Sequence, residues 1–160
     1  MGGANAAYAH ALRLLSVRSR SSADLRRRLG KKDYPQAQID AAIARCRELD
    51  YINDPRTACE RARALTRSGK VGPRIRLELR KEGFEEQDIE EAAATSATNH
   101  DEHAVLTEVF TRRFDTDNTD LRDPRQRRRI VNYLQRRGFA LNIIFDHINE
   151  RQNDPYAEHE

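Results

Sequence analysis

Arginine dominates the basic residues of this chain, and its abundance indicates a surface that binds anions. Of the 29 basic residues among 160, 25 are Arg and four are Lys. The planar guanidinium group grips carboxylates and phosphates through two parallel hydrogen bonds, which a lysine ammonium group cannot do. A genome rich in G and C, whose codons favour Arg, is the alternative explanation. The placement of the arginines along the chain bears on this choice.

The basic residues gather in three segments, each expected to be the second helix of a three-helix unit. At 100° per residue, the basic side chains of each segment lie opposite its apolar side chains. Recurrence at equivalent positions favours a binding surface over a merely solvated helix face, with phosphates or an acidic protein surface as its partner. The expected contact residues are Arg18, Arg20, Arg26, Arg27, Arg74, Arg76, Lys81, Arg129, Arg136 and Arg137.

Two residues of this set have a structural alternative. Arg18 and Arg20 precede a predicted helix and could act there as capping groups or as partners of Asp24. A further residue departs from the repeating pattern, because Leu77 lies off the apolar face of its helix. We expect Leu77 to pack on a neighbouring repeat.

Self-comparison of the chain reveals the repeat that positions the basic segments. Shifted by 50 residues, the apolar residues of 25–43 fall on those of 75–93, and a further shift of 55 brings them onto 130–148. A left-handed helix end is expected four residues after the second leucine of each block, where Gly is best suited and Asp is tolerated. These positions are Asp33, Gly83 and Gly138.

The apolar periodicity is helical almost throughout, and no alternating pattern of a β-strand appears. We therefore predict an all-α fold of three tandem three-helix repeats that form an elongated, curved body. Helix starts are expected at Asp54-Pro55 and Asp123-Pro124, where the carboxylate caps the helix and proline takes its first position. The predicted repeats span residues 1–52, 53–98 and 99–150, followed by a polar, disordered tail at 151–160.

Enzyme, metal and membrane functions find little support. The motifs of phosphate-binding loops, serine hydrolases, zinc proteases and dinucleotide-binding folds are missing, so we expect no catalysis and no cofactor. His100 and His103 have the spacing of a zinc-ligand pair, but their place at a predicted helix start favours capping, so no metal site is expected. Cys46 and Cys59 lie in helical patterns and are expected to be free thiols. With no apolar membrane span and no leader pattern at Met1, we expect a cytoplasmic protein. We also expect it to be a monomer.

Four stretches carry a resemblance to a known family. They are Leu14-Leu15-Ser16-x-Arg18-x-Arg20-Ser21-x-x-Asp24-Leu25-x-x-x-Leu29, Leu49-x-x-Ile52-Asn53-Asp54, Gly72-x-Arg74-Ile75-x-x-x-Leu79-x-x-x-Gly83-Phe84 and Tyr133-Leu134-x-Arg136-Arg137-Gly138-Phe139. In order and spacing they are similar to the motifs of the RecX family of bacterial regulators of the recombinase RecA. The resemblance covers residues 8–150. Asn53 stands where the family usually has the first Asp of an Asp-Asp pair.

The resemblance implies an all-helical, non-enzymatic protein that lodges in the groove of the RecA–single-stranded-DNA filament. There it would block filament growth or promote disassembly, and so suppress strand exchange and the ATPase and coprotease activities of RecA. The expected partner is the RecA filament, with single- or double-stranded DNA as a secondary contact. The alternative is a general nucleic-acid-binding helical module that acts without RecA, which predicts tight, salt-sensitive binding to naked DNA. A net charge of only +3 favours weak binding of naked DNA.

Overall fold

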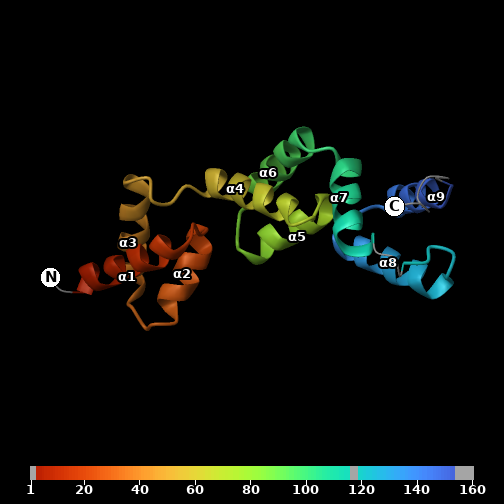
Figure 1. The fold of residues 1–160 in the computed structure, drawn as a ribbon. Helices are drawn as coiled ribbons and strands as arrows, with labels where there is room; N and C mark the ends of the chain where they lie inside the picture. Colours follow the sequence, from red (N-terminus) through yellow and green to blue (C-terminus); the bar gives the residue numbers. More distant parts are fainter. Residues whose placement is uncertain (1–2, 116–118, 154–160) are drawn as a thin grey trace. The chain divides into compact units, whose positions relative to one another are not determined.

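The computed structural model describes residues 3–115 and 119–153, and within these ranges every regular element is an α-helix (Figure 1). The predicted all-α fold is confirmed. A helix precedes each of the matched blocks 25–43, 75–93 and 130–148, and these three helices are α1, α4 and α7. The nine helices of the described residues are α1 Gly3–Val17, α2 Ser22–Gly30, α3 Gln36–Glu48, α4 Asp54–Arg67, α5 Gly72–Lys81, α6 Glu86–Asn99, α7 Glu102–Phe114, α8 Pro124–Arg136 and α9 Leu141–Asn153.

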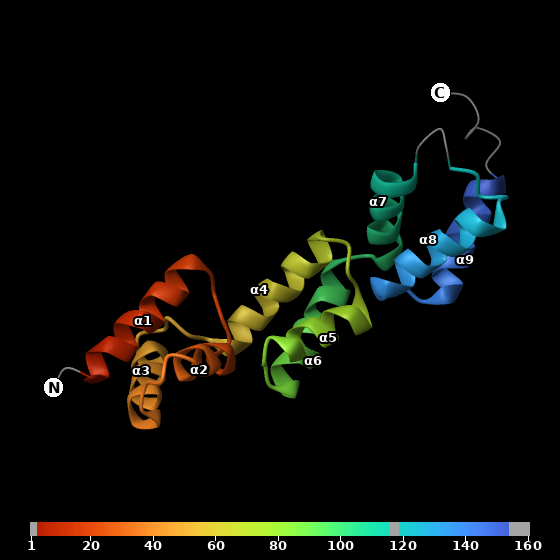
Figure 2. The same cartoon turned by 90° about the horizontal axis from the view of Figure 1, so that it is seen from below.

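The helices fall three to each predicted repeat, and Figure 2 shows them from a second side. Contacts within the chain divide it into two compact units. The first unit comprises residues 1–62 and 76–95, and the second unit comprises residues 63–75 and 96–160. Helix α9 continues to Asn153, three residues into the segment predicted as a tail. The rest of that segment, 154–160, lies outside the described residues. The repeat boundaries and the curved arrangement stay predictions.

The core of the first unit lies among α1, α2 and α3. Leu25 and Leu29 of α2 and Ile43 of α3 have at most 1% of their surface exposed, as the repeat spacing predicts for these apolar positions. Around this core pack the half-buried rings of Tyr8 and Tyr34. The remaining buried members of the cluster are Ala11, Ile39, Cys46 and Ile52.

The core of the second unit is formed by α7, α8 and α9. Its ring contacts include Phe114 of α7, which meets Tyr133 of α8 edge-on at 5.2 Å between centroids. Val71, from the segment between α4 and α5, joins the same cluster. The other buried members are Leu106, Val109, Phe110, Ile130, Leu134, Phe139, Ile144 and Ile148.

The second helix of each repeat ends in the left-handed backbone conformation, as predicted. The φ angles are +57° at Asp33, +84° at Gly83 and +102° at Gly138. At two of these positions glycine also permits a close approach. A Cβ on Gly83 would lie 3.0 Å from the Cβ of Ala23, and one on Gly138 would lie 2.4 Å from the carbonyl oxygen of Val71. Glycine at these ends therefore serves both the turn and the packing that follows it.

One predicted helix cap is confirmed and one is wrong. The carboxylate of Asp123 caps α8 by accepting the backbone N–H two residues on, and proline occupies the first turn. At α4 the cap is Asn53, whose side-chain oxygen accepts the backbone N–H of Arg56 at 3.1 Å. Asp54 is instead the first residue of α4, and its Oδ1 accepts the backbone N–H of Ser22 at 2.8 Å. Both residue types cap helices well, so local sequence did not distinguish the two positions.

Two predictions about single side chains have opposite outcomes. Cys46 is buried and Cys59 is half-buried, and both are free thiols, as predicted. Leu77, predicted to pack on a neighbouring repeat, has 40% of its surface exposed, so that prediction is wrong. A single exposed leucine on a helix is tolerated in water.

Candidate partner-binding surface

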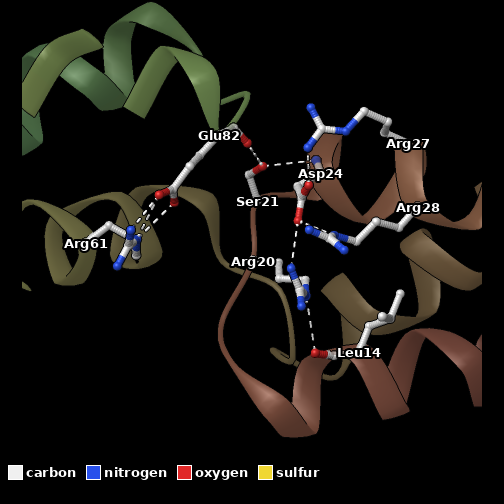
Figure 3. A network of polar contacts seen from close by, with 8 residues as sticks. All are labelled: Leu14, Arg20, Ser21, Asp24, Arg27, Arg28, Arg61 and Glu82. Carbon is white, nitrogen blue, oxygen red and sulfur yellow. Dashed lines mark hydrogen bonds and ion pairs between the residues drawn. The ribbon is translucent and has the colours of Figure 1, made fainter. Parts of the chain in front are cut away.

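Asp24 is the centre of an arginine cluster in the first unit. Its side chain is only 5% exposed and accepts hydrogen bonds from Arg20, Arg27 and Arg28, which converge on it in Figure 3. The Nη1 of Arg20 lies 3.0 Å from Oδ2 of Asp24, and its Nε donates to the carbonyl oxygen of Leu14 at 3.2 Å. With a side chain 8% exposed, Arg20 joins the end of α1 to α2. The pairing with Asp24 that was the alternative for Arg20 is therefore observed.

The pKa of Asp24 reflects two opposed effects. Burial raises the pKa of the carboxyl group, but hydrogen bonds from Arg28 and Arg20 outweigh it and leave the pKa below its ordinary value. The same turn is anchored by Ser21, which caps α2 through the backbone N–H of Asp24 at 3.0 Å and donates to the carbonyl oxygen of Glu82. The carboxylate of Glu82 in turn pairs with Arg61, as Figure 3 shows. Arg20 and Arg27 thus belong to a network that holds the first unit together.

Two further predicted contact residues form ion pairs between the second and third helices of their repeats. Arg26 of α2 pairs with Asp40 of α3. Arg76 of α5 binds both carboxylate oxygens of Glu90 of α6, at 2.8 Å and 3.0 Å. The bond from Arg76 is the main reason that the pKa of Glu90 is lowered. Each pair joins residues that are fourteen apart, at equivalent positions of the repeat. A partner that used these arginines would have to compete with an internal carboxylate.

Arg137 has a structural role in the second unit. Its Nη1 donates to the carbonyl oxygen of Ser68 at 2.5 Å, and its guanidinium group lies over the ring of Tyr133 at 4.6 Å. The backbone N–H of Val71 donates to the carbonyl oxygen of Arg137 at 3.0 Å. These contacts tie the end of α8 to the connection between α4 and α5. Arg74 is half-buried nearby, with its Cβ close to Gly138.

The exposed face of α8 carries two of the predicted contact residues, Arg129 and Arg136. The helix carries five arginines and no acidic residue. Among the described residues, no ion pair involves Arg129 or Arg136, and both are exposed. Apart from the proline at its start, every exposed residue of α8 is Arg, Asn or Gln. These residues are Arg125, Arg128, Arg129, Asn132, Gln135 and Arg136.

Four further exposed cations bear on the predicted surface, namely Arg18, Lys81, Arg125 and Arg128. Arg18 and Lys81 are exposed outside α8, and within the described part of the chain neither forms an ion pair. The expected contacts did not include Arg125 and Arg128. Their spacing along α8 was the available signal, because positions 125, 129, 132 and 136 recur on one face of a helix. Of the ten expected contacts, five bind groups of the chain itself, and Arg74 is half-buried. The five are Arg20, Arg26, Arg27, Arg76 and Arg137. The other four, Arg18, Lys81, Arg129 and Arg136, are exposed and form no ion pair among the described residues.

The start of α7 is capped by an acidic side chain. Asp101 caps α7 by accepting the backbone N–H of His103 at 3.0 Å, as the capping interpretation predicts. The Nδ1 of His100 lies 3.1 Å from the carbonyl oxygen of Ser96. Over residues 3–115 and 119–153, no group of three or more His, Cys, Asp and Glu side chains could hold a metal ion. The helices of these same ranges are all too short or too polar to cross a membrane.

Known proteins resemble this chain in sequence over most of its length. A family model described as the first three-helix domain of RecX matches residues 7–46. The regulatory protein RecX of Syntrophotalea carbinolica is 39% identical over 147 residues, which cover 91% of this chain and 96% of the relative. The regulatory protein RecX of Trichlorobacter lovleyi is 32% identical over 138 residues, or 86% of this chain and 90% of the relative.

Solved structures resemble it in fold. A crystal structure of regulatory protein RecX gives a TM-score of 0.74 at 23% identity, covering 92% of this chain and 73% of the other. RecX from Lactobacillus salivarius gives a TM-score of 0.67 at 24% identity, covering 93% and 96%. The helical fold is thus shared with RecX structures. From its sequence similarity to curated relatives along nearly the full length, the chain belongs to the RecX family.

Proposed function

We propose that this protein is a negative regulator of the RecA recombinase. It binds in the groove of the RecA–single-stranded-DNA filament and inhibits filament growth, strand exchange, ATPase activity and coprotease activity. The observation that carries the proposal is the 39% identity, over 91% of the chain, to a protein named regulatory protein RecX. The regulator acts by binding, without chemistry of its own, as a cytoplasmic monomer. Its repeats span residues 1–52, 53–98 and 99–150.

The exposed arginines of α8 supply the contact with the filament. Arg129 and Arg136 have no carboxylate partner among the described residues, so a partner can bind them without breaking an internal ion pair. Arg26 and Arg76 are already paired with Asp40 and Glu90, so they contribute less. The partner groups are carboxylates of RecA or nearby DNA phosphates, both of which guanidinium groups bind well. Electrostatic attraction of this kind raises the rate of association and orients the partners.

Reversal of charge on α8 tests the proposal. The double variant Arg129→Glu/Arg136→Glu should inhibit the DNA-dependent ATPase activity of RecA at concentrations at least about tenfold higher than the unmodified chain requires. The matched control is Arg13→Glu/Arg63→Glu, which changes net charge equally at exposed sites on α1 and α4. This control should inhibit within about twofold of the unmodified chain.

The outcomes separate the parts of the proposal. Circular dichroism must show equal helicity for both variants, so that a loss of inhibition reports on contact and not on folding. Unchanged inhibition by the α8 variant would remove α8 from the contact surface. A lack of inhibition by the unmodified chain would refute RecA regulation itself.

A general nucleic-acid-binding module that acts without RecA is the second candidate function. The observation in its favour is the exposed face of α8, where Arg, Asn and Gln side chains match the groups that contact phosphates and base edges. This function predicts that the chain binds naked DNA as well as it binds a RecA filament. It also predicts that the affinity falls steeply with salt.

A further inference from the structure

In the first two repeats, ion pairs close the edge between the second and third helices. These pairs cross the edge in an antiparallel register, so that a step of four residues forward on one helix accompanies a step of four back on the other. Their carboxylates are about half-exposed, and the edge is therefore hydrophilic. The pairs are Arg26–Asp40 in the first repeat, and Arg76–Glu90 and Arg80–Glu86 in the second.

The third repeat keeps the register and loses the ion pairs. The Nη2 of Arg127 on α8 donates to Oδ1 of Asn149 on α9 at 3.2 Å. Under the repeat shift of 55, this pair lies one step of four residues beyond the position equivalent to Arg76 and Glu90. The same register can be followed along α8 and α9 to the positions that are equivalent to the two ion pairs of the second repeat. At each of these positions, the third repeat has a pair that contains an apolar side chain. The residues opposite each other are Val131 with Phe145, and Gln135 with Leu141.

The apolar side chains at this edge remain in contact with water. Leu141 has 45% of its surface exposed and Phe145 has 39%, and their spacing of four residues places them on one face of α9. Val131 is half-buried and packs against the core of the second unit. Single exposed apolar side chains are common, but adjacent ones are typical of an interaction site. Here two such side chains lie next to each other on one helix. We call the residues Val131, Leu141 and Phe145 the α8/α9 edge.

The charges beside the α8/α9 edge select the kind of partner. Arg128 is exposed three residues before Val131 on the same side of α8, and α8 has no acidic residue. On a second copy of the chain, the matching helix α8 would offer Arg128 no carboxylate. DNA phosphates would satisfy the arginine but gain nothing from Leu141 and Phe145. A protein surface that presents an apolar side chain flanked by carboxylates satisfies both features.

We propose that the α8/α9 edge docks such an acidic, apolar protein surface, and that Leu141 and Phe145 are its anchors. Identifying this surface as part of RecA rests on the proposed function above. Anchors of this kind contribute most of the binding energy when the partner covers them, while the surrounding arginines orient the approach. At the position of Val131 and Phe145, both earlier repeats have an ion pair. At the position of Gln135 and Leu141, only the second repeat has one. The edge therefore distinguishes the third repeat from the first two.

The test removes the apolar anchors and leaves the charges unchanged. The full chain, labelled with a fluorophore, is titrated with RecA filaments assembled on single-stranded DNA with a non-hydrolysable ATP analogue. The variant Leu141→Gln/Phe145→Gln should bind at least about tenfold more weakly than the unmodified chain. The control Leu77→Gln removes an apolar residue of matching exposure, 40%, on α5, and should bind within about twofold. The conservative variant Phe145→Leu, which keeps an apolar anchor, should retain most of the affinity.

Each other outcome overturns a defined part of the account. Equal affinity of the double variant would refute the α8/α9 edge as a docking site while the proposed function stands, provided that the unmodified chain binds filaments. Failure of the unmodified chain to bind filaments would refute the proposed function. An equal loss of affinity for naked single-stranded DNA would overturn the choice of a protein partner. If the unmodified chain sediments as a dimer and the Leu141→Gln/Phe145→Gln variant sediments as a monomer, the occupant of the edge is a second copy of the chain. Thermal unfolding must show that all variants fold.

Discussion

Replacing Asp24 by Asn should destabilise the first unit by about 2–3 kcal/mol. The bond to Arg20 lies between side chains that are 8% and 5% exposed, and such a charge-assisted bond contributes about 1.5–3 kcal/mol. Arg27 and Arg28 are 56% and 40% exposed, so solvent screening limits each of their pairs to about 0.5 kcal/mol. Asparagine retains one acceptor oxygen, which recovers about 1 kcal/mol through a neutral hydrogen bond.

Thermal and urea unfolding followed by circular dichroism measure this loss. For a chain of this length, the expected destabilisation lowers the melting temperature by about 4–10 °C. The matched control is Asp40→Asn, which removes the partner of Arg26 where both side chains are about half-exposed, so it should destabilise the chain far less than Asp24→Asn does. The structural reasoning is wrong if the two substitutions cost the same.

The pH dependence supplies a second measurement of the same group. The pKa of Asp24 is lowered in the folded chain, so its stabilising contribution is fully present above the ordinary value of 3.8 and is lost as the pH falls through the folded value. The difference in stability between the unmodified chain and Asp24→Asn should therefore shrink on acidification below pH 3.8. A difference that stayed constant would show that the carboxylate charge is not what stabilises the cluster.

Three further substitutions test other parts of the fold. Gly138→Ala should cost about 2–4 kcal/mol in urea unfolding, because a Cβ at φ +102° would lie 2.4 Å from the carbonyl oxygen of Val71. Leu134→Ala, at a position with no exposed surface, should cost about 2–5 kcal/mol by the same assay. His147 is 9% exposed and packs edge-on against Phe110, and burial lowers its pKa below 6.5. The unfolded chain therefore takes up the proton first, and stability should fall as the pH drops below 6.5, with a weaker fall in His147→Leu.

Controls for these substitutions lie on the same chain. Gly30 ends α2 with no neighbouring atom within 4 Å of the place that a Cβ would take, so Gly30→Ala should leave stability equal or slightly higher. Leu77→Ala, at an exposed position, should cost less than about 1 kcal/mol. Equal costs for Gly138→Ala and Gly30→Ala, or for Leu134→Ala and Leu77→Ala, would contradict the packing described for the second unit. An unchanged pH dependence in His147→Leu would show that other groups cause it.

The helices and their ends could be predicted because local features determine them. Apolar residues that recur at helical spacing must be buried, and Leu25, Leu79 and Leu134 are buried in the second helices of the three repeats. A left-handed helix end requires a residue that tolerates positive φ, and the shifted blocks supplied Gly83 and Gly138 at that point. Self-comparison was therefore the most informative step, since each copy supports the assignment of the others.

The partners of the arginines could not be predicted in the same way. A long, flexible side chain finds its partner in space, and the sequence separation of fourteen between Arg26 and Asp40 hides that pairing from local inspection. The contact between Arg20 and Asp24 was visible as an alternative because Arg20 lies just before the predicted helix whose first turn holds Asp24. Phe145 was missed as a surface residue for a related reason. Its exposure becomes informative only when Phe145 is compared with Glu90, the equivalent residue of the second repeat, which forms an ion pair with Arg76.

Binding of the labelled chain to RecA–single-stranded-DNA filaments and to naked single-stranded DNA, compared over a range of salt concentrations, tests the central claim most directly. A RecA regulator should bind the filament at least about tenfold more tightly than naked DNA at moderate salt, because protein contacts persist when phosphate contacts are screened. Equal or tighter binding to naked DNA, with an affinity that falls steeply with salt for both targets, would contradict the account and favour a general nucleic-acid-binding module.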